Sequence, residues 1–574
     1  MPTRRPVVSA LRFASLAAAA VLPGCRSLDI ERKAPAGTEA DLLLAGGTVR
    51  TLAPSLPAVV EALAVRDGRI VAAGDLASVS ATCGPRTRVV DLRGGCVVPG
   101  LADAHGHVLG YGLSLRRIDL VGTTSAEEVA ARVEAAARRA RPGEFILGRG
   151  WDQNDWPVAA FPGRALLDRA APRNPVVLVR VDGHAIWVNG AAFEAAGVGS
   201  ATPDPPGGKI LRDPRSGEPT GVLVDTATDL VESRIPPLTD AERRAALEDS
   251  LARLAAFGLT GIHDAGVGRD TLADYRRLEA EGRLPLRIYV LLADDPELLR
   301  EEFARGPETS GGGLLAVRAV KLYADGALGS RGAALLEPYS DDPGNVGLLV
   351  SEPEHLEDVT TRALAAGFQA CVHAIGDRGN RVALDVFERA LARAGRADAR
   401  LRVEHAQVVA PDDLRRFARL GVVASMQPTH CTSDMYWAAD RLGPRRVLGA
   451  YAWRSLLDAG ARIAAGSDFP VESPDPLLGL YAARTRQDRN GWPEAGFLPS
   501  ERMTAEEALR SFTTEAAYAS FRERDLGSIA PGMLADLTVL DRDPVECAPA
   551  DLLDAKIRMT IVNGRVVYEA GPPD

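Results

Sequence analysis

The pattern of apolar and polar positions divides the chain into three kinds of region. Short apolar stretches separated by Gly and Asp-Gly turns at residues 40–74 predict strands joined by hairpins, and the same pattern returns at residues 532–568. Neither stretch is long enough to bury a core alone. We therefore expect residues 40–96 and 525–574 to pack together as one small composite β-domain, in the manner of a β-sandwich.

Between these ends, apolar runs of strand length alternate with stretches of helical periodicity. Eight such βα units predict a distorted parallel (β/α)8 barrel over residues 97–524, with its active site at the carboxyl ends of the strands. An open doubly wound sheet is the alternative topology. The expected strands are residues 97–107, 259–263, 286–292, 317–323, 368–373, 401–405, 422–427 and 463–468.

One connection is much longer than the others. About 150 residues separate His107 from the second expected strand, far more than a crossover needs. We expect an inserted subdomain at about residues 117–235, which would emerge at the mouth of the active site. Trp151 in this segment is either an apolar wall of the substrate pocket or part of the core of the insertion itself.

The N-terminus has the features of an export signal. Arg4 and Arg5 precede an apolar stretch at residues 13–22, and Leu-Pro-Gly-Cys25 follows it. We expect residues 1–25 to be a signal peptide of the lipoprotein type, with Cys25 as a lipid anchor and residues 26–39 as a tether. An ordinary secretory signal is the alternative. Either reading predicts an exported protein of the cell envelope, periplasmic or on the outer surface.

Composition narrows the class of protein. The chain has 574 residues, of which 46% are hydrophobic and 25% charged, as in globular proteins. A net charge of −10 argues against an extended nucleic-acid surface. No apolar run after the N-terminal segment is long enough to span a membrane, so any membrane attachment would depend on Cys25.

Polar residues at the ends of the expected strands are candidates for a metal site. His105 and His107 point the same way, because side chains of a strand alternate between its faces. A mixed set of imidazoles and a carboxylate suits zinc, iron or manganese better than calcium or magnesium. The other residues that strands would deliver to the same rim are Lys321, His373, His405 and Asp468.

Lys321 needs a separate explanation, because an ammonium group would be repelled by nearby cations. If CO₂ carboxylated it, the resulting carbamate would be anionic and could bridge two metals. The alternative is an uncarboxylated lysine that forms an ion pair and orients the substrate.

Several motifs resemble those of the amidohydrolase superfamily, specifically its YtcJ-like branch, which includes N-substituted formamide deformylases. They occur in order over nearly the whole chain after the N-terminal segment. The matching stretches are Ala102-Asp-Ala-His-Gly-His107, Gly150-Trp-Asp-Gln-Asn154, Asp182-Gly-His-Ala185, Lys321-Leu-Tyr-Ala-Asp-Gly-Ala-Leu-Gly-Ser-Arg331, His373-Ala-Ile-Gly-Asp-Arg378, Val403-Glu-His-Ala-Gln407, Ser425-Met-Gln-Pro428 and Gly466-Ser-Asp-Phe-Pro-Val-Glu472.

The resemblance implies a metal-dependent hydrolase of small molecules that cleaves a non-peptide carbon–nitrogen bond in an amide, an N-substituted formamide or a cyclic amide. It implies one or two divalent ions, with zinc favoured. His105, His107 and Asp468 would bind the more buried ion. The resemblance further assigns His373 and His405 to a second ion, and carboxylated Lys321 to a bridge between the two.

The chemistry would follow from the charge of the metal, which lowers the pKa of water from 15.7 to about 7. Asp468 would accept the proton of that water and pass it to the leaving nitrogen. Deamination or ester and lactone hydrolysis on the same fold stays open, as does a catalytically inert surface lipoprotein that only binds a ligand. A homodimer also stays open.

Candidate substrate contacts have weaker support. His184 lies in the insertion and His263 at the end of an expected strand, while Gln427 ends the seventh strand. Asp325 and Arg331 lie in the long Gly-rich stretch that follows the fourth strand. Trp151 completes this group. His355 and His430 have no supporting context, and we assign them to the surface or to loops.

Overall fold

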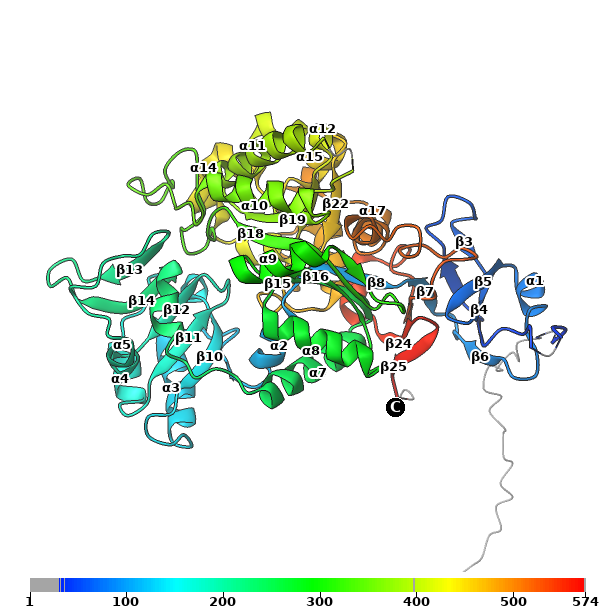
Figure 1. Cartoon of the computed structure of the whole chain (residues 1–574), viewed down its shortest axis with the longest axis horizontal. Coiled ribbons are helices and arrows are strands. Elements are labelled where there is room, and N and C mark those ends of the chain that lie inside the picture. Colours follow the sequence, from blue (N-terminus) through cyan, green and yellow to red (C-terminus); the bar gives the residue numbers. More distant parts are fainter. Residues whose placement is uncertain (1–29, 31, 36, 396–397, 572–574) are drawn as a thin grey trace, which may run out of the picture.

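The computed structural model describes residues 30, 32–35, 37–395 and 398–571. The expected signal peptide and Cys25 lie outside the described residues. Figure 1 shows three parts along the long axis: the insertion at one end, the barrel in the middle, and the β-rich part built from the N-terminal strands at the other end. In the described part of the chain, no helix combines the length and apolar character needed to cross a membrane.

The central part is a barrel of eight parallel strands, which confirms the predicted fold class. The first and last strands meet through backbone hydrogen bonds from His107 N to Phe469 O (2.8 Å) and from Asp468 N to His105 O (2.7 Å). A two-residue strand, β17 (Glu308–Thr309), adds to β18 in antiparallel orientation. In spatial order the barrel strands are β8 (Leu101–Gly106), β15 (Leu259–Val267), β16 (Arg287–Leu292), β18 (Leu315–Tyr323), β19 (Gln369–Ala374), β20 (Arg402–His405), β21 (Val423–Met426) and β22 (Arg462–Ala465).

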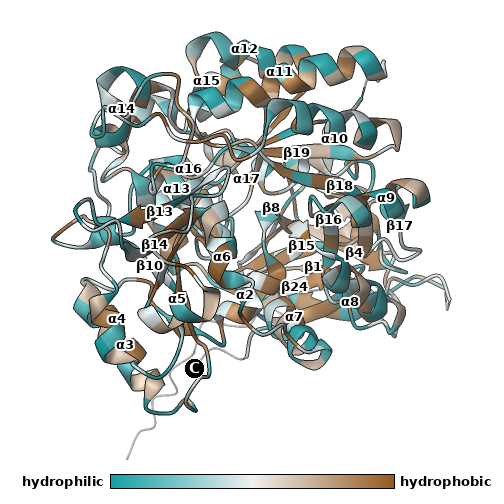
Figure 2. Cartoon of the chain, turned by 60° about the vertical axis from the view of Figure 1, so that its left-hand side comes forward, coloured by the Kyte–Doolittle hydropathy of each residue, from teal (hydrophilic) through white to brown (hydrophobic). Residues whose placement is uncertain are grey.

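Amphipathic helices cover the outside of the barrel. In α11 (Asp377–Ala394) the residues Ala383, Val386, Phe387 and Ala390 are buried, a spacing that places them on one face. Figure 2 shows hydrophobic residues along barrel strands such as β18 and hydrophilic residues on the outer turns of α11 and α12 (Leu414–Leu420). Other helices of this layer are α7 (Asp240–Ala256), α8 (Arg269–Ala280), α10 (Pro353–Ala365) and α15 (Trp453–Asp458).

The strand expected over residues 97–107 is two strands, which corrects the prediction. β7 (Cys96–Pro99) belongs to the β-domain, whereas β8 belongs to the barrel. The chain changes sheet at Gly100, where a Cβ atom would lie 2.2 Å from the hydroxyl oxygen of Thr260. Glycine therefore allows the close approach on which this junction depends.

The two ends of the chain share a sheet of six strands in the order β25-β24-β23-β7-β2-β3. Buried side chains from both ends form one core there, among them Val49, Val97, Leu537 and Ile561. A second sheet, β5-β4-β1-β6, comes from the N-terminal segment alone. The strands are β1 (Leu42–Ala45), β2 (Thr48–Arg50), β3 (Val59–Val60), β4 (Ala62–Arg66), β5 (Arg69–Gly74), β6 (Arg88–Asp91), β23 (Leu537–Leu540), β24 (Ile557–Val562) and β25 (Arg565–Glu569).

The insertion has its own mixed sheet, in the order β13-β14-β12-β11-β10-β9. Trp151, Trp156 and Trp187 pack against one another in its core, with ring centroids 6.1 to 6.3 Å apart. Trp151 is fully buried, so the structure places it in the core of the insertion rather than on the wall of a pocket. The strands are β9 (Ile118–Asp119), β10 (Ile146–Trp151), β11 (Val176–Arg180), β12 (Ala185–Val188), β13 (Gly208–Arg212) and β14 (Pro219–Asp225).

Candidate metal centre

Three potential metal ligands converge where the first and last barrel strands meet. His107 Nε2 lies 3.0 Å from Asp468 Oδ1, and His105 Nε2 lies 3.6 Å from the same oxygen. The three ligand atoms all lie within 4.8 Å of one another. His105 comes from the end of β8, His107 from the residue that precedes α2 (Val108–Ser114), and Asp468 from the loop after β22.

Neighbouring groups fix the ring orientation of three histidines at the rim. In each ring Nδ1 is engaged, so that Nε2 is the nitrogen left to face the centre. This arrangement is the one that orients histidine ligands of a metal, because the outer hydrogen bond selects the tautomer. The Nδ1 contacts are His105 to Glu404 (2.5 Å), His107 to the carbonyl oxygen of Ala265 (2.9 Å) and His405 to Oε1 of Gln427 (2.8 Å).

His430 joins His405 and Asp468 in a second candidate group of ligands, whose ligand atoms again lie within 4.8 Å of one another. Its Nε2 lies 3.8 Å from Asp468 Oδ2 and has no hydrogen-bond partner although it is buried. Its ring stacks on that of His405 with centroids 5.9 Å apart. A buried nitrogen without a partner costs free energy, which a bound cation would offset.

His373 also lies at this rim, with its ring centroid 4.6 Å from that of His405. Its Nε2, however, lies 3.4 Å from the carbonyl oxygen of Gly326. The structure therefore brings His405 together with His430 in a compact group of ligand atoms, and places His373 beside that group.

Lys321 is buried at the centre of the rim, with Nζ 3.2 Å from Nε2 of His105. Burial lowers the pKa of this lysine, against the opposing influence of Glu404 and Asp468. A lowered pKa favours the neutral amine, which is the form that reacts with CO₂. Both sequence interpretations, a carboxylated bridge and an uncarboxylated lysine that forms an ion pair and orients the substrate, stay predictions.

The protonation states of the central groups suit a cation. Burial and the neighbouring Lys321 lower the pKa of His105 to about 4, so that the imidazole is neutral at pH 7. Burial raises the pKa of Asp468, but the hydrogen bond with His107 and the nearby imidazoles outweigh it and hold that pKa well below its ordinary value. Neutral imidazoles beside an ionised carboxylate are the donor set that zinc prefers.

A cavity of about 820 Å³ opens above this centre, between the barrel rim and the insertion. His184 of the insertion lines it together with the metal-site residues and Tyr323. Burial lowers the pKa of His184, but its hydrogen bond to Asp225 (2.8 Å) outweighs that effect, and on balance the pKa is raised. The ring of His184 lies 5.1 Å from that of His373, so a substrate at the centre would be within its reach.

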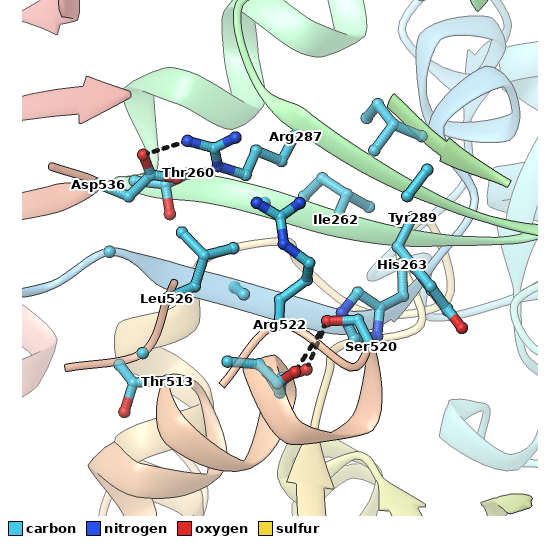
Figure 3. A pocket seen from close by; sticks show the side chains of 18 of the residues that line it. Thr260, Ile262, His263, Arg287, Tyr289, Thr513, Ser520, Arg522, Leu526 and Asp536 are labelled. Atoms are coloured by element: carbon cyan, nitrogen blue, oxygen red, sulfur yellow. Dashed lines mark hydrogen bonds and ion pairs between the residues drawn. The ribbon is translucent and has the colours of Figure 1, made fainter. Parts of the chain in front are cut away.

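The other expected substrate contacts do not line this cavity. His263 is buried inside the barrel, where its Nδ1 lies 2.9 Å from Nη1 of Arg402. Its ring packs against Tyr289, and both residues line a second, smaller cavity (Figure 3). It occupies the middle of β15 rather than its carboxyl end.

Three more of these residues serve local structure. Asp325 accepts hydrogen bonds from the backbone N–H groups of Ala334, Ile375 and Gly376, which uses its carboxylate inside the fold. Arg331 pairs with Asp341 at 2.9 Å. Gln427 holds its Oε1 2.8 Å from Nδ1 of His405 and donates from Nε2 to the carbonyl oxygen of Ser425.

Sequence reasoning missed His430 and Glu404. His430 lies in α13 (Pro428–Asp434), immediately after the seventh barrel strand, and this proximity to a strand end was the available signal. Glu404 directly precedes His405, and alternation along β20 turns it into the barrel toward His105.

A parallel barrel with histidines and an aspartate converging at its carboxyl rim belongs to the class of metal-dependent hydrolases. Residues 88–568 match the model of the amidohydrolase family. The chain therefore belongs to the amidohydrolase family.

Known proteins similar over most of the chain agree with this assignment. Protein LONG AFTER FAR-RED 3 of Arabidopsis thaliana is 37% identical, over 93% of this chain and 92% of its own. The N-substituted formamide deformylase of Arthrobacter pascens is 32% identical, over 92% of this chain and 98% of its own. The crystal structure of an uncharacterised metal-dependent hydrolase from Pyrococcus horikoshii superposes with a TM-score of 0.71 at 30% identity, covering 88% of this chain and 99% of that one.

Proposed function

We propose that this protein cleaves a non-peptide carbon–nitrogen bond in an amide, an N-substituted formamide or a cyclic amide. The observation that carries the proposal is the set of histidines whose Nδ1 atoms are held so that Nε2 faces the ionised Asp468. The relative from Arthrobacter pascens, named for the deformylation of N-substituted formamides, supports the bond type.

A divalent cation bound by these residues would activate a water molecule and polarise the carbonyl group of the substrate. Asp468, ionised and at the centre, would be the group to accept a proton from such a water and pass it toward the leaving nitrogen. His184 faces the centre from the insertion and donates a hydrogen bond to the substrate. Its pairing with Asp225 keeps it protonated more readily than a free histidine.

We further propose that zinc is the native metal, that one or two ions bind, and that Lys321 is carboxylated. Support for the last point is the burial of Lys321 among histidines, where a cationic ammonium would oppose metal binding. The test is metal content per subunit after reconstitution with and without bicarbonate, for the native chain and for Lys321→Met. Bicarbonate should raise metal content in the native chain alone, and equal content in all four samples would exclude carboxylation.

A hydrolysis screen tests the proposed activity. Metal-loaded protein is assayed against N-substituted formamides, other amides, cyclic amides, esters and substrates of deamination, with Asp468→Asn as the matched control. We expect turnover on one of the amide classes that Asp468→Asn abolishes. Turnover confined to deamination or to esters and lactones would replace the proposed bond type. Metal-free, inactive protein would instead support the ligand-binding alternative.

Export, lipid attachment at Cys25 and a homodimer stay predictions. Metabolic labelling with a radioactive fatty acid, compared between the native chain and Cys25→Ser, tests the anchor. Size-exclusion chromatography with light scattering tests the oligomeric state.

A further inference from the structure

The cavity above the metal centre has a basic wall supplied by the insertion. Arg149 belongs to β10 and Arg117 directly precedes β9, and both line the cavity. The barrel rim, with Asp468, supplies another part of its lining. The two guanidinium groups therefore share one cavity with the reacting centre, and Asp468 acts on the pKa of Arg149 across it.

The two arginines lack partners that would neutralise them. Arg149 donates from Nη2 to the carbonyl oxygen of Val181 (2.8 Å), but its Nε is buried without a hydrogen-bond partner. Among the residues that the structure describes, no carboxylate oxygen lies within 4.0 Å of the guanidinium of Arg149 or Arg117. Burial lowers the pKa of both, which is the penalty for removing a cation from water without a counter-ion.

Arg180 lines the same cavity but, unlike Arg149 and Arg117, has carboxylate partners. It forms ion pairs with Asp182 (2.5 Å) and with Asp152, and its Nε donates to Gln153 (2.8 Å). Two carboxylates already neutralise its charge. We therefore assign the basic wall for a ligand to Arg117 and Arg149, which have no such direct ion pairs among the described residues.

The charge of this wall favours a ligand with a negatively charged group. Asp468, Asp182 and Glu232 all act on the pKa of Arg149. Asp468 is engaged with the metal-site histidines and Asp182 with Arg180, which leaves Glu232 for the two arginines. Two guanidinium groups share the influence of this one carboxylate, so the wall keeps an excess of positive charge.

Another part of the cavity lining is acidic and disfavours a second negative charge. Asp155 lines it, and burial together with Asp152 raises the pKa of Asp155 to about 6. Glu472 also belongs to this part and acts in the same direction on Asp155. A phosphate dianion would be repelled there, whereas a carboxylate at the arginines would balance the basic wall.

We propose that Arg149 and Arg117 bind a carboxylate of the substrate, so that the preferred substrates are N-acylated amino acids, in which the scissile amide lies beside a carboxylate. This inference rests on the proposed carbon–nitrogen hydrolysis and names its substrate class. The remainder of the cavity suits an apolar side chain, since its lining includes Leu109, Leu113, Val121, Leu328 and Trp437.

A matched pair of substrates measures the contribution of the carboxylate to kcat/KM. Racemic N-formylphenylalanine and N-formyl-2-phenylethylamine differ only in that group. We expect the native enzyme to show the higher kcat/KM on the acid, and Arg149→Met to lower that value about 10- to 100-fold, the usual strength of a charged hydrogen bond. The ratio of kcat/KM on the acid to kcat/KM on the neutral formamide should therefore fall in the variant, and its remaining turnover of the neutral formamide shows that the protein is folded.

Two further variants control the experiment. Arg117→Met should reduce kcat/KM on the acid in the same direction. Arg116→Met should change neither substrate, because Arg116 points away from the cavity and pairs with Asp249 on the surface. Equal effects of Arg149→Met on both substrates, or a native preference for the neutral formamide, would overturn the inference and leave the proposed hydrolysis standing.

Binding without turnover separates the two proposals. N-methylsulfonylphenylalanine cannot be hydrolysed at an acyl carbon, and N-methylsulfonyl-2-phenylethylamine is its neutral match. Calorimetry should show tighter binding of the acid to the native protein, and loss of that difference in Arg149→Met. If this holds while neither formamide is cleaved, the carboxylate site stands and the proposed hydrolysis fails. If the two sulfonamides bind equally, the carboxylate site fails.

Discussion

The two ends of the barrel bury polar side chains in opposite ways. At the lower end, where the strands begin, Arg287 of β16 forms a bidentate pair with Asp536 of the β-domain at 2.5 and 2.8 Å (Figure 3). The cavity there is only about 50 Å³. At the upper rim, Asp468 faces three imidazoles, the Nε2 of His430 has no partner, and the cavity is about 820 Å³.

The difference shows how buried charge can be assigned to structure or to function. Arg287 and Asp536 satisfy each other and connect the barrel to the β-domain, so nothing further needs to bind there. The histidines of the rim are oriented by groups behind them while their facing nitrogens stay available. We infer that buried nitrogens which are held in one orientation but keep a free lone pair mark the functional end of this fold.

The largest expected effect concerns Asp468. Asp468→Asn keeps the size of the side chain but removes the ability to accept a proton. We expect kcat to fall about 10³-fold, in the range for general acid–base catalysis, with a smaller loss of metal content. Steady-state kinetics and elemental analysis of the same preparation measure both. Near-normal turnover in the variant would show that another group accepts the proton.

The next-largest expected effect is a loss of stability at the lower end of the barrel, without a change in catalysis. Arg287→Met leaves Asp536 buried without its partner, which should lower the free energy of unfolding by about 3–5 kcal/mol. Chemical denaturation measures this loss, and kcat per folded molecule should stay unchanged. Arg269→Met removes an exposed pair with Glu301 and should cost about 1 kcal/mol or less. If Arg287→Met instead reduces kcat of the folded enzyme, the separation of the two ends is wrong.

A smaller effect tests whether the rim histidines are oriented from behind. Gln427→Leu removes the group that holds Nδ1 of His405 and changes no charge. We expect zinc affinity to fall about 10- to 100-fold, as for other partners of ligating histidines. Competition with a chromogenic chelator measures the affinity. Gln407→Leu, which removes a buried amide bonded to Tyr451, should leave it unaltered. Indistinguishable affinities for the two variants would argue against His405 as a ligand.

The smallest effect concerns a satisfied pair on the outer surface of the barrel. The hydrogen bond from Arg454 to Glu507 lowers the pKa of Glu507 to about 2, and Glu507 also closes a capping box with Thr504 on α17 (Ala505–Ser511). A depressed carboxyl pKa stabilises the fold above the unfolded value near 4.5, and the contribution is lost as pH falls toward 2.

Glu507→Gln should therefore lower the free energy of unfolding by about 1 kcal/mol at pH 7. The difference in Tm between the native chain and the variant should shrink as pH falls below about 4.5. Calorimetry at pH 7, 4.5 and 3.5 follows it. A Tm difference that stays constant over this range would mean that the charge of Glu507 contributes nothing.

The barrel was predictable from the sequence because its strands are short apolar runs separated by helical periodicity. The first strand was extended too far, since the apolar run continues through residues 97–99 into a different sheet and only Gly100 marks the junction. Local hydrophobicity does not record which sheet a strand joins.

The candidate site was predictable where residues lie at the end of an apolar run, as for His105 in β8 and for Asp468 shortly after β22. It was not predictable for His430, which reaches the rim from a helix, or for His263, whose strand continues four residues beyond it to Val267. The unpaired state of Arg149 is also invisible in the sequence, because its lack of a counter-ion depends on segments far apart in the chain.

The candidate metal centre coincides with the seam that closes the barrel. Ser467 donates from its hydroxyl to Asp103 (2.6 Å), and the backbone of Asp468 bonds to that of His105, so residues more than 350 positions apart in sequence are fixed side by side. During synthesis, the histidine pair emerges long before the aspartate that completes the ligand set. The ligand set is therefore complete only late in folding, and a bound ion would then resist separation of the first and last barrel strands.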